Sequence, residues 1–166
     1  MRTIPEAIIA EVNMRMNQLY PGAHRITSPV LRNEYKHGSC FHLATALHKL
    51  NPDLLQTWVL CEQPQEVYDE HQDWLSGDRS TPEPDKAYGH AFVMLSDEPR
   101  FKRVLDIEGL RPLANMRMQS VWCRLEHCFQ VPPDDFTRWT ESEDPDLDRV
   151  VAEVLFDYYL EEYPRS

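Results

Sequence analysis

Proline is the feature of this sequence that most limits how the chain can fold. The 166 residues include thirteen prolines but five glycines. Because proline fixes one backbone torsion and lacks a backbone N–H, it tends to end the helix or strand that precedes it. We therefore expect many short elements with fixed breaks between them and few permissive turns.

The spacing of apolar residues indicates where these elements lie. Helical spacing is found in four segments: 5–20, 40–50, 113–129 and 146–163. Strand composition is found in three: 55–61, 90–95 and 101–107. Residues 29–36 are expected to be irregular. The length fits a single domain over residues 1–166, and we expect an α+β fold with helices packed on a small antiparallel sheet.

Two segments carry the negative charge of the chain, whose formal net charge is −11. Residues 62–85 carry −7 and residues 131–164 carry −9, so the rest of the chain is net positive. The first segment belongs to a long insertion at 62–87, in which we expect a short helix around 66–75. Insertions of this length are typically lids, binding segments or partly disordered. The acidity of the two segments fits either a solvated surface or a face that binds a basic partner.

Composition also excludes several classes of function. A strongly acidic chain is repelled by nucleic acids and by anionic membrane surfaces. No apolar run approaches the ~18 residues of a membrane span, and the first six residues lack the apolar core of a signal peptide. We expect a cytoplasmic protein with no membrane role.

Cys40 is the first candidate for chemistry. It follows Gly38 and Ser39 at the expected start of an apolar helix. The first turn of a helix presents unpaired N–H groups and a partial positive charge, which favour the nucleophilic thiolate form. A small buried thiol without a chemical role is the alternative. The other three cysteines, Cys61, Cys123 and Cys128, lie in apolar stretches and are expected to be structural.

His90 and Asp106 are the second and third candidates. His90 opens one apolar strand, and Asp106 interrupts another near its end. If Leu95 and Phe101 close a hairpin between these strands, His90 lies directly opposite Asp106 and on the same face of the sheet. A half-buried carboxylate such as that of Asp106 needs a partner, because an unpaired charge there is costly. In this geometry the partner is the His90 imidazole, which the carboxylate can orient.

These residues lie in three short motifs, Gly-Ser-Cys before a helix, Gly-His-Ala-Phe-Val, and Leu-Asp-Ile-Glu-Gly. Together they resemble the Cys-His-Asp arrangement of the papain-like and transglutaminase-like superfamily, over residues 38–109. The resemblance implies a papain-like core with the nucleophile at a helix N-terminus. It also implies Cys40 as nucleophile, His90 as general base and acid, and Asp106 as the orienting acid.

The sequence departs from this superfamily at the oxyanion position. Papain-like peptidases usually place a glutamine about six residues before the cysteine, and here that position is Glu34 with Asn33 beside it. The backbone N–H of Cys40 remains available as an oxyanion donor, with Asn33 or His37 as the second one.

Metal binding is the rival interpretation of the same region, since His37, Cys40, His42 and His48 are clustered in sequence. Their spacing matches no common zinc pattern, because His42 and His48 fall on different faces of a helix. We therefore expect no metal and no cofactor.

The sequence predicts a cysteine-nucleophile enzyme that acts on a peptide or side-chain amide, as a peptidase, a deamidase or an acyl transferase. Its partner is expected to be a protein or peptide substrate, and the acidic segments would suit a basic one. The alternative is an acidic, non-catalytic interaction or inhibitor protein that binds a basic partner.

Overall fold

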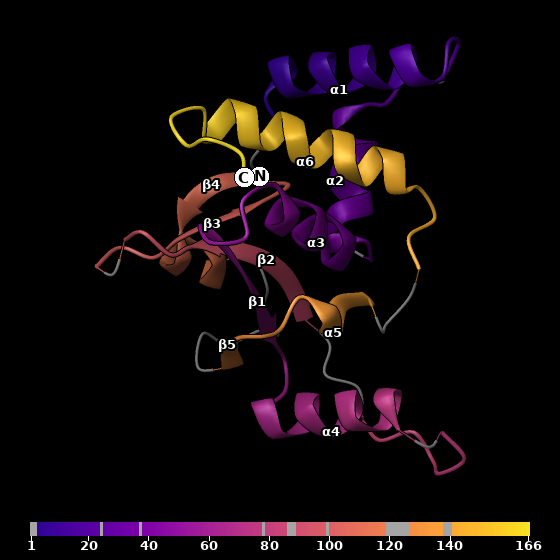
Figure 1. The fold of residues 1–166 in the computed structure, drawn as a ribbon, viewed down its shortest axis with the longest axis vertical. Helices are drawn as coiled ribbons and strands as arrows, with labels where there is room; N and C mark the ends of the chain where they lie inside the picture. The colour runs from indigo at the N-terminus through magenta and orange to yellow at the C-terminus, as the bar shows by residue number, and fades with distance from the viewer. Residues whose placement is uncertain are drawn as a thin grey trace.

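A computed structural model describes residues 3–23, 25–36, 38–77, 79–85, 89–98, 100–118, 127–137 and 141–166. Within these residues the fold contains six α-helices, one 3-10 helix and five strands (Figure 1). The helices are α1 (Glu6–Leu19), α2 (Ser28–Lys36), α3 (Cys40–Leu50), α4 (Gln65–Ser76), α5 (Asp134–Thr137), α6 (Pro145–Tyr159) and the 3-10 helix η1 (Leu113–Met118). The strands are β1 (Leu55–Cys61), β2 (Gly89–Leu95), β3 (Arg103–Asp106), β4 (Gly109–Pro112) and β5 (Cys128–Gln130).

The five strands form one antiparallel sheet in the order β4-β3-β2-β1-β5. β1 and β2 are the longest pair and run together from Leu55 opposite Leu95 to Cys61 opposite Gly89. The expected α+β class with a small antiparallel sheet is therefore confirmed.

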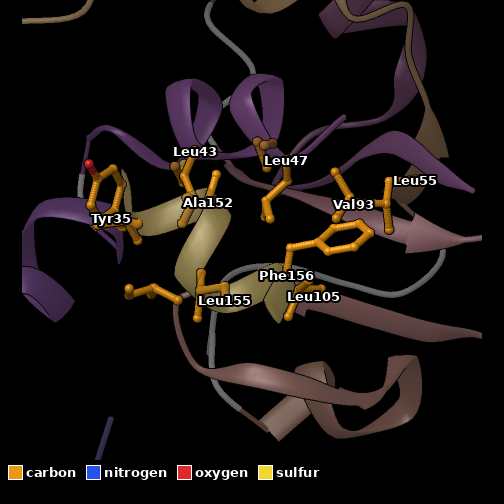
Figure 2. Close-up of a cluster of buried hydrophobic side chains, with 14 of the residues drawn as sticks. Tyr35, Leu43, Leu47, Leu55, Val93, Leu105, Ala152, Leu155 and Phe156 are labelled. Atoms are coloured by element: carbon orange, nitrogen blue, oxygen red, sulfur yellow. The ribbon is translucent and has the colours of Figure 1, made fainter. Parts of the chain in front are cut away.

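Helices α3, α6 and α1 stack in that order on one face of this sheet. α3 packs on β1 and β2, α6 packs on α3, and α1 packs on α6 (Figure 1). Figure 2 shows Phe156 of α6 lying among side chains of α3 and of the strands, including Leu47 and Val93. None of the helices in the described ranges is long and apolar enough to cross a membrane.

The opposite face of the sheet has its own, smaller core. Because side chains alternate along a strand, Phe92 and Met94 point away from the helices and pack with Leu60, Val104 and Met116. The central strand β2 is thus buried on both faces, and its position is strongly determined.

The expectation of an irregular segment at 29–36 is wrong, because Ser28–Lys36 is helix α2. Pro29 lies in the first turn, where the missing N–H has no intrahelical partner to lose. Leu31 and Tyr35 are four residues apart and both buried, so the helix presents one apolar face to the core.

The helix expected at 113–129 is also wrong over its described parts. Leu113–Met118 is the 3-10 helix η1, and Cys128–Gln130 is strand β5. Residues 119–126 lie outside the described residues. Phe129 pairs with Val59 of β1, so pairing across the chain decides the structure there.

The C-terminal helix differs from expectation at its end. It was expected at 146–163, but α6 ends at Tyr159 because Leu160 has left helical geometry. Its start is well defined: Asp144 accepts a hydrogen bond from the N–H of Leu147 at 3.0 Å, and Pro145 follows this cap.

The hairpin register is displaced by two residues from the expected one. β3 begins at Arg103, and Val93 pairs with Leu105 instead of residue 103. Phe101 is 76% exposed, and Lys102 instead accepts a hydrogen bond from Leu113, extending the β3–β4 pairing. A displacement of two residues keeps every side chain on its face. His90 and Asp106 therefore remain on one face as diagonal neighbours.

Candidate active site at the start of helix α3

Cys40 is the first residue of α3, as the sequence predicts. The carbonyl of Ser39 accepts hydrogen bonds from the N–H groups of His42 and Leu43, both at 3.1 Å, and this starts the helix. The Ser39 side chain makes no capping bond and donates instead to Glu34 at 2.7 Å. Cys40 belongs to the larger core, and the residue is 3% exposed.

His90 is the second residue of β2 and lies opposite Leu60 of β1. The preceding Gly89 permits a close approach to β1, since a Cβ there would lie 2.2 Å from the carbonyl oxygen of Leu60. The side chain of His90 is 19% exposed. The imidazole is therefore the part of the site that solvent reaches most easily.

The imidazole and Asp106 form a direct hydrogen bond, with 2.6 Å between Nε2 and Oδ2. Burial alone would lower the pKa of His90, but the hydrogen bonds and charges of Asp106 and Cys40 outweigh it and raise that pKa. Burial would raise the pKa of Asp106, but the bonds and charges of His90 and Arg111 hold it below its usual range. Both shifts favour an imidazolium paired with a carboxylate.

Cys40 completes the group, because its thiol lies close enough to the imidazole to raise the pKa of His90 together with Asp106. Since Nε2 is bound to Asp106, Nδ1 is the ring nitrogen left for the thiol. The structure thus brings together the three residues that the sequence singled out, from α3, β2 and β3.

Arg111 is a site residue that the sequence analysis missed. It is 1% exposed and forks around Asp106, with Nη1 2.7 Å from Oδ1 and Nη2 2.9 Å from Oδ2. The backbone N–H of Glu108 donates to the same carboxylate at 2.9 Å. The available signal was the spacing of the two residues, since Arg111 follows Asp106 across a two-residue turn. A tight hairpin brings the residues after the turn back beside the strand that precedes it.

Glu108 was missed as well. Its side chain is 3% exposed, and Oε1 accepts from Arg32 at 2.8 and 3.1 Å and from Lys36 at 3.3 Å. Burial would raise its pKa, but the bond to Arg32 and the charges of Lys36 and Arg111 lower it. Nothing in the sequence alone joins residues 32 and 108, because the contact depends on how α2 meets the sheet.

Of the two side-chain candidates for an oxyanion donor, the described one, Asn33, is not brought to this group. Asn33 is an exposed residue of α2 and has no hydrogen bond to Cys40 or His90 within the described ranges. His37 lies outside the described residues. The N–H of Cys40 belongs to the first turn of α3, where backbone donors have no intrahelical acceptor.

The acidic insertion begins beside this site, because β1 ends at Cys61, opposite the residue that precedes His90. Its helix α4 is close to the expected 66–75 and lies at the far end of the molecule from α1 (Figure 1). Tyr68 anchors it through a hydrogen bond to Asp135 at 3.1 Å and an edge contact with Phe129. Four of its carboxylates are exposed at helical spacing on one side: Glu66, Asp69, Glu70 and Asp73.

The remaining described cysteines are poor nucleophiles by environment. Cys61 is buried, and burial raises the pKa of Cys128 to about 11 despite the charge of Lys102. Cys123 lies outside the described residues. Among the described side chains, no group of three or more His, Cys, Asp or Glu is placed to hold a metal ion.

Comparisons with family models, with curated proteins and with solved structures find no match to this chain. The geometry of the site itself therefore carries the functional argument.

Proposed function

We propose that this protein is a thiol enzyme that attacks a peptide or side-chain amide through Cys40, His90 and Asp106. The observation that carries the proposal is the continuous contact from the thiol to the imidazole to the carboxylate. An activated thiol needs an adjacent base, and that base needs a third group to orient it.

In the proposed reaction, His90 carries the proton of the thiol in a thiolate–imidazolium pair, and the thiolate sulfur forms a bond to the amide carbonyl carbon. The tetrahedral intermediate expels the amine when His90 returns the proton to its nitrogen, and a thioester to Cys40 remains. Water then attacks the thioester with His90 as base, and the carbon–sulfur bond breaks. The carboxylic acid leaves, and the Cys40 thiolate and the His90 imidazolium are restored. A second amine in place of water would give acyl transfer, and ammonia as the leaving amine would make the reaction a deamidation.

The start of α3 supports the proposal from the backbone side. Developing negative charge on the carbonyl oxygen needs preorganised donors, and the N–H of Cys40 lies in a helix turn that leaves it free of an intrahelical bond. The partial positive charge of the helix N-terminus acts in the same direction.

The arrangement of elements favours a papain-like core. A helix that begins with the nucleophile packs against an antiparallel sheet whose neighbouring strands carry the histidine and the aspartate. This is the arrangement that the resemblance implies, and we propose the superfamily on that ground together with the three motifs.

A non-catalytic interaction protein is the second candidate, and two observations favour it. Cys40 is 3% exposed, so its thiol is less accessible than that of a typical open site. The exposed carboxylates of α4 form a face that a basic segment would complement. In that case the Cys40–His90–Asp106 group would be a buried structural network.

Site-resolved alkylation separates the two functions. We expect iodoacetamide to modify Cys40 into mildly acidic pH, because an imidazolium beside the sulfur stabilises the thiolate. His90→Ala should shift the rate profile of Cys40 toward that of an ordinary thiol, and Asp106→Asn should shift it less. Cys61 and Cys128 serve as internal controls and should stay slow.

The measurement is the alkylation rate of each cysteine against pH from about 5 to 9, with products assigned by mass spectrometry. If Cys40 reacts no faster than free cysteine over this range and His90→Ala changes nothing, the enzyme is excluded and the interaction protein is favoured.

A further inference from the structure

Glu108 is a buried acid outside the Cys40–His90–Asp106 group, and its partners lie on the helix that leads to Cys40. One oxygen of its carboxylate receives three N–H donors from α2, two from Arg32 and one from Lys36. The other oxygen lies 3.9 Å from Nη1 of Arg111. Glu108 therefore ties α2 to the β3–β4 hairpin.

The position of α2 is passed on to Cys40 through two further hydrogen bonds. The Glu34 side chain of α2 accepts from the Ser39 hydroxyl at 2.7 Å, and the Glu34 carbonyl accepts from the Ser39 N–H at 3.1 Å. Ser39 immediately precedes α3. A shift of α2 would thus move the point at which α3, and with it Cys40, begins.

The β3–β4 turn, which carries Glu108, also holds the imidazole side of the site. The backbone N–H of Glu108 donates to Oδ1 of Asp106 at 2.9 Å, and Asp106 in turn binds His90. One residue is therefore bonded to the nucleophile side through its carboxylate and to the imidazole side through its backbone.

We propose that Glu108 is a positioning residue for the thiol–imidazole pair, acting through Arg32 and Lys36 of α2. The inference rests on the proposed function. Proton transfer and attack at the sulfur depend steeply on geometry, and a misplacement near 1 Å can reduce a rate by about a hundredfold. A buried ion pair by itself need not add stability, so the placement of three buried or half-buried charges here requires a reason.

A purely structural role makes a different prediction. Loss of the carboxylate would then lower the free energy of unfolding but leave the reactivity of Cys40 in the folded protein unchanged. The pH profile of Cys40 alkylation therefore distinguishes positioning from stability.

The test compares Glu108→Gln, Arg32→Met and Lys36→Met with the matched control Arg15→Met. Arg15 is also a partly buried arginine that joins two elements, since it binds Glu11, Glu153 and Asp157 across α1 and α6. At pH 6 we expect alkylation of Cys40 to slow roughly tenfold in Glu108→Gln and Arg32→Met, and less in Lys36→Met. Arg32→Lys should recover part of the rate, and Arg15→Met should match the native protein.

The rates should converge near pH 9, where an ordinary thiol is itself largely ionised. Variants that unfold more easily but retain the native Cys40 profile would overturn the inference and leave the proposed function standing. A native protein whose Cys40 already behaves like free cysteine would overturn both. If Glu108→Gln does not fold, Arg32→Met, Arg32→Lys and Lys36→Met decide the question, because each leaves the buried carboxylate with a cationic partner.

Discussion

At the scale of single residues, Asp106 is the most completely bonded group in the site. Each of its two oxygens accepts a hydrogen bond from Arg111, and each accepts one more, from the Glu108 backbone or from His90. A carboxylate with every strong acceptor position occupied stays ionised and cannot rotate. His90 therefore has an anionic partner of fixed orientation.

Arg111→Met should strongly destabilise the protein, because it removes the buried guanidinium that binds both oxygens of Asp106. Breaking a buried pair on one side costs about 3–5 kcal/mol. The control Arg149→Met removes an arginine whose side chain is 49% exposed and pairs with Asp146 on the surface of α6. An exposed pair of that kind contributes about 0–1 kcal/mol.

Urea denaturation of both variants measures the difference. Arg111→Lys should fall between the native protein and Arg111→Met, since lysine keeps the charge but not the fork. Equal losses in Arg111→Met and Arg149→Met would show that the buried fork contributes no more than a surface pair.

At the scale of elements, the β3–β4 hairpin organises the site. Two residues, Ile107 and Glu108, connect Asp106 to Gly109, so the turn brings a buried acid, a second buried acid and an arginine into one place. Gly109 has a φ of +100°, a backbone conformation that residues other than glycine rarely adopt. The ring of Tyr159 from α6 covers this turn and limits the space there further.

Gly109→Ala should therefore cost more stability than Gly22→Ala. Both glycines have positive φ, +100° and +83°, but a Cβ at Gly109 would lie 2.5 Å from the hydroxyl oxygen of Tyr159, whereas nothing lies within 4 Å at Gly22. We expect about 1–2 kcal/mol from backbone strain in each variant, and a further ~1–3 kcal/mol from overpacking in Gly109→Ala alone.

Thermal or urea unfolding of the two variants checks this difference. The same displacement of the turn should also slow alkylation of Cys40 in Gly109→Ala but not in Gly22→Ala. A smaller loss of stability in Gly109→Ala than in Gly22→Ala would mean that Tyr159 moves away at no cost.

At the scale of the whole molecule, acid should unfold the protein through the buried carboxylates of Asp106 and Glu108. The pKa of each is lower in the folded protein, because the cationic partners outweigh the opposing effect of burial. Such groups contribute stability that is present above the unfolded pKa, about 4 for a carboxylate. That stability is lost as pH falls through the lower folded pKa.

His90 contributes with the opposite sign. Its pKa is raised in the folded protein, so its contribution is present below the unfolded value of about 6.5 and is lost as pH rises through the folded one. Between about pH 4 and pH 6.5 the Asp106 carboxylate and the His90 imidazolium are both charged, and the site is most stable.

We therefore expect the free energy of unfolding in urea to fall more steeply below about pH 4 in the native protein than in Glu108→Gln. Glu66→Gln, at an exposed position on α4, should keep the native pH dependence. Parallel curves for Glu108→Gln and the native protein would show that the buried acid does not contribute to the acid limit of stability.

Much of the arrangement could be predicted from local sequence. The apolar spacing of residues 40–50 and the strand composition of 55–61 match α3 and β1, because α3 buries one face in the larger core and β1 contributes to both cores. The expected register failed by two residues, since it did not include β4, whose pairing extends β3 toward Lys102. Segment 128–130 was misassigned because its structure depends on a partner distant in sequence, Val59 for Phe129. Segment 29–36 was misassigned although its signals are local, a proline in the first turn and two apolar residues four apart.

The sequence by itself determined that His90 and Asp106 share a face and that Cys40 starts a helix, because strand parity and helix-start signals require only local rules. That Cys40 would join the pair was implied only by the resemblance. Only the tertiary structure decided what surrounds them. Arg111 reaches Asp106 through a turn, and Glu108 reaches Arg32 and Lys36 because α2, unrecognised as a helix, packs beside the hairpin. Ion pairs between buried groups follow from the packing of whole elements, and no periodicity along the chain encodes that packing.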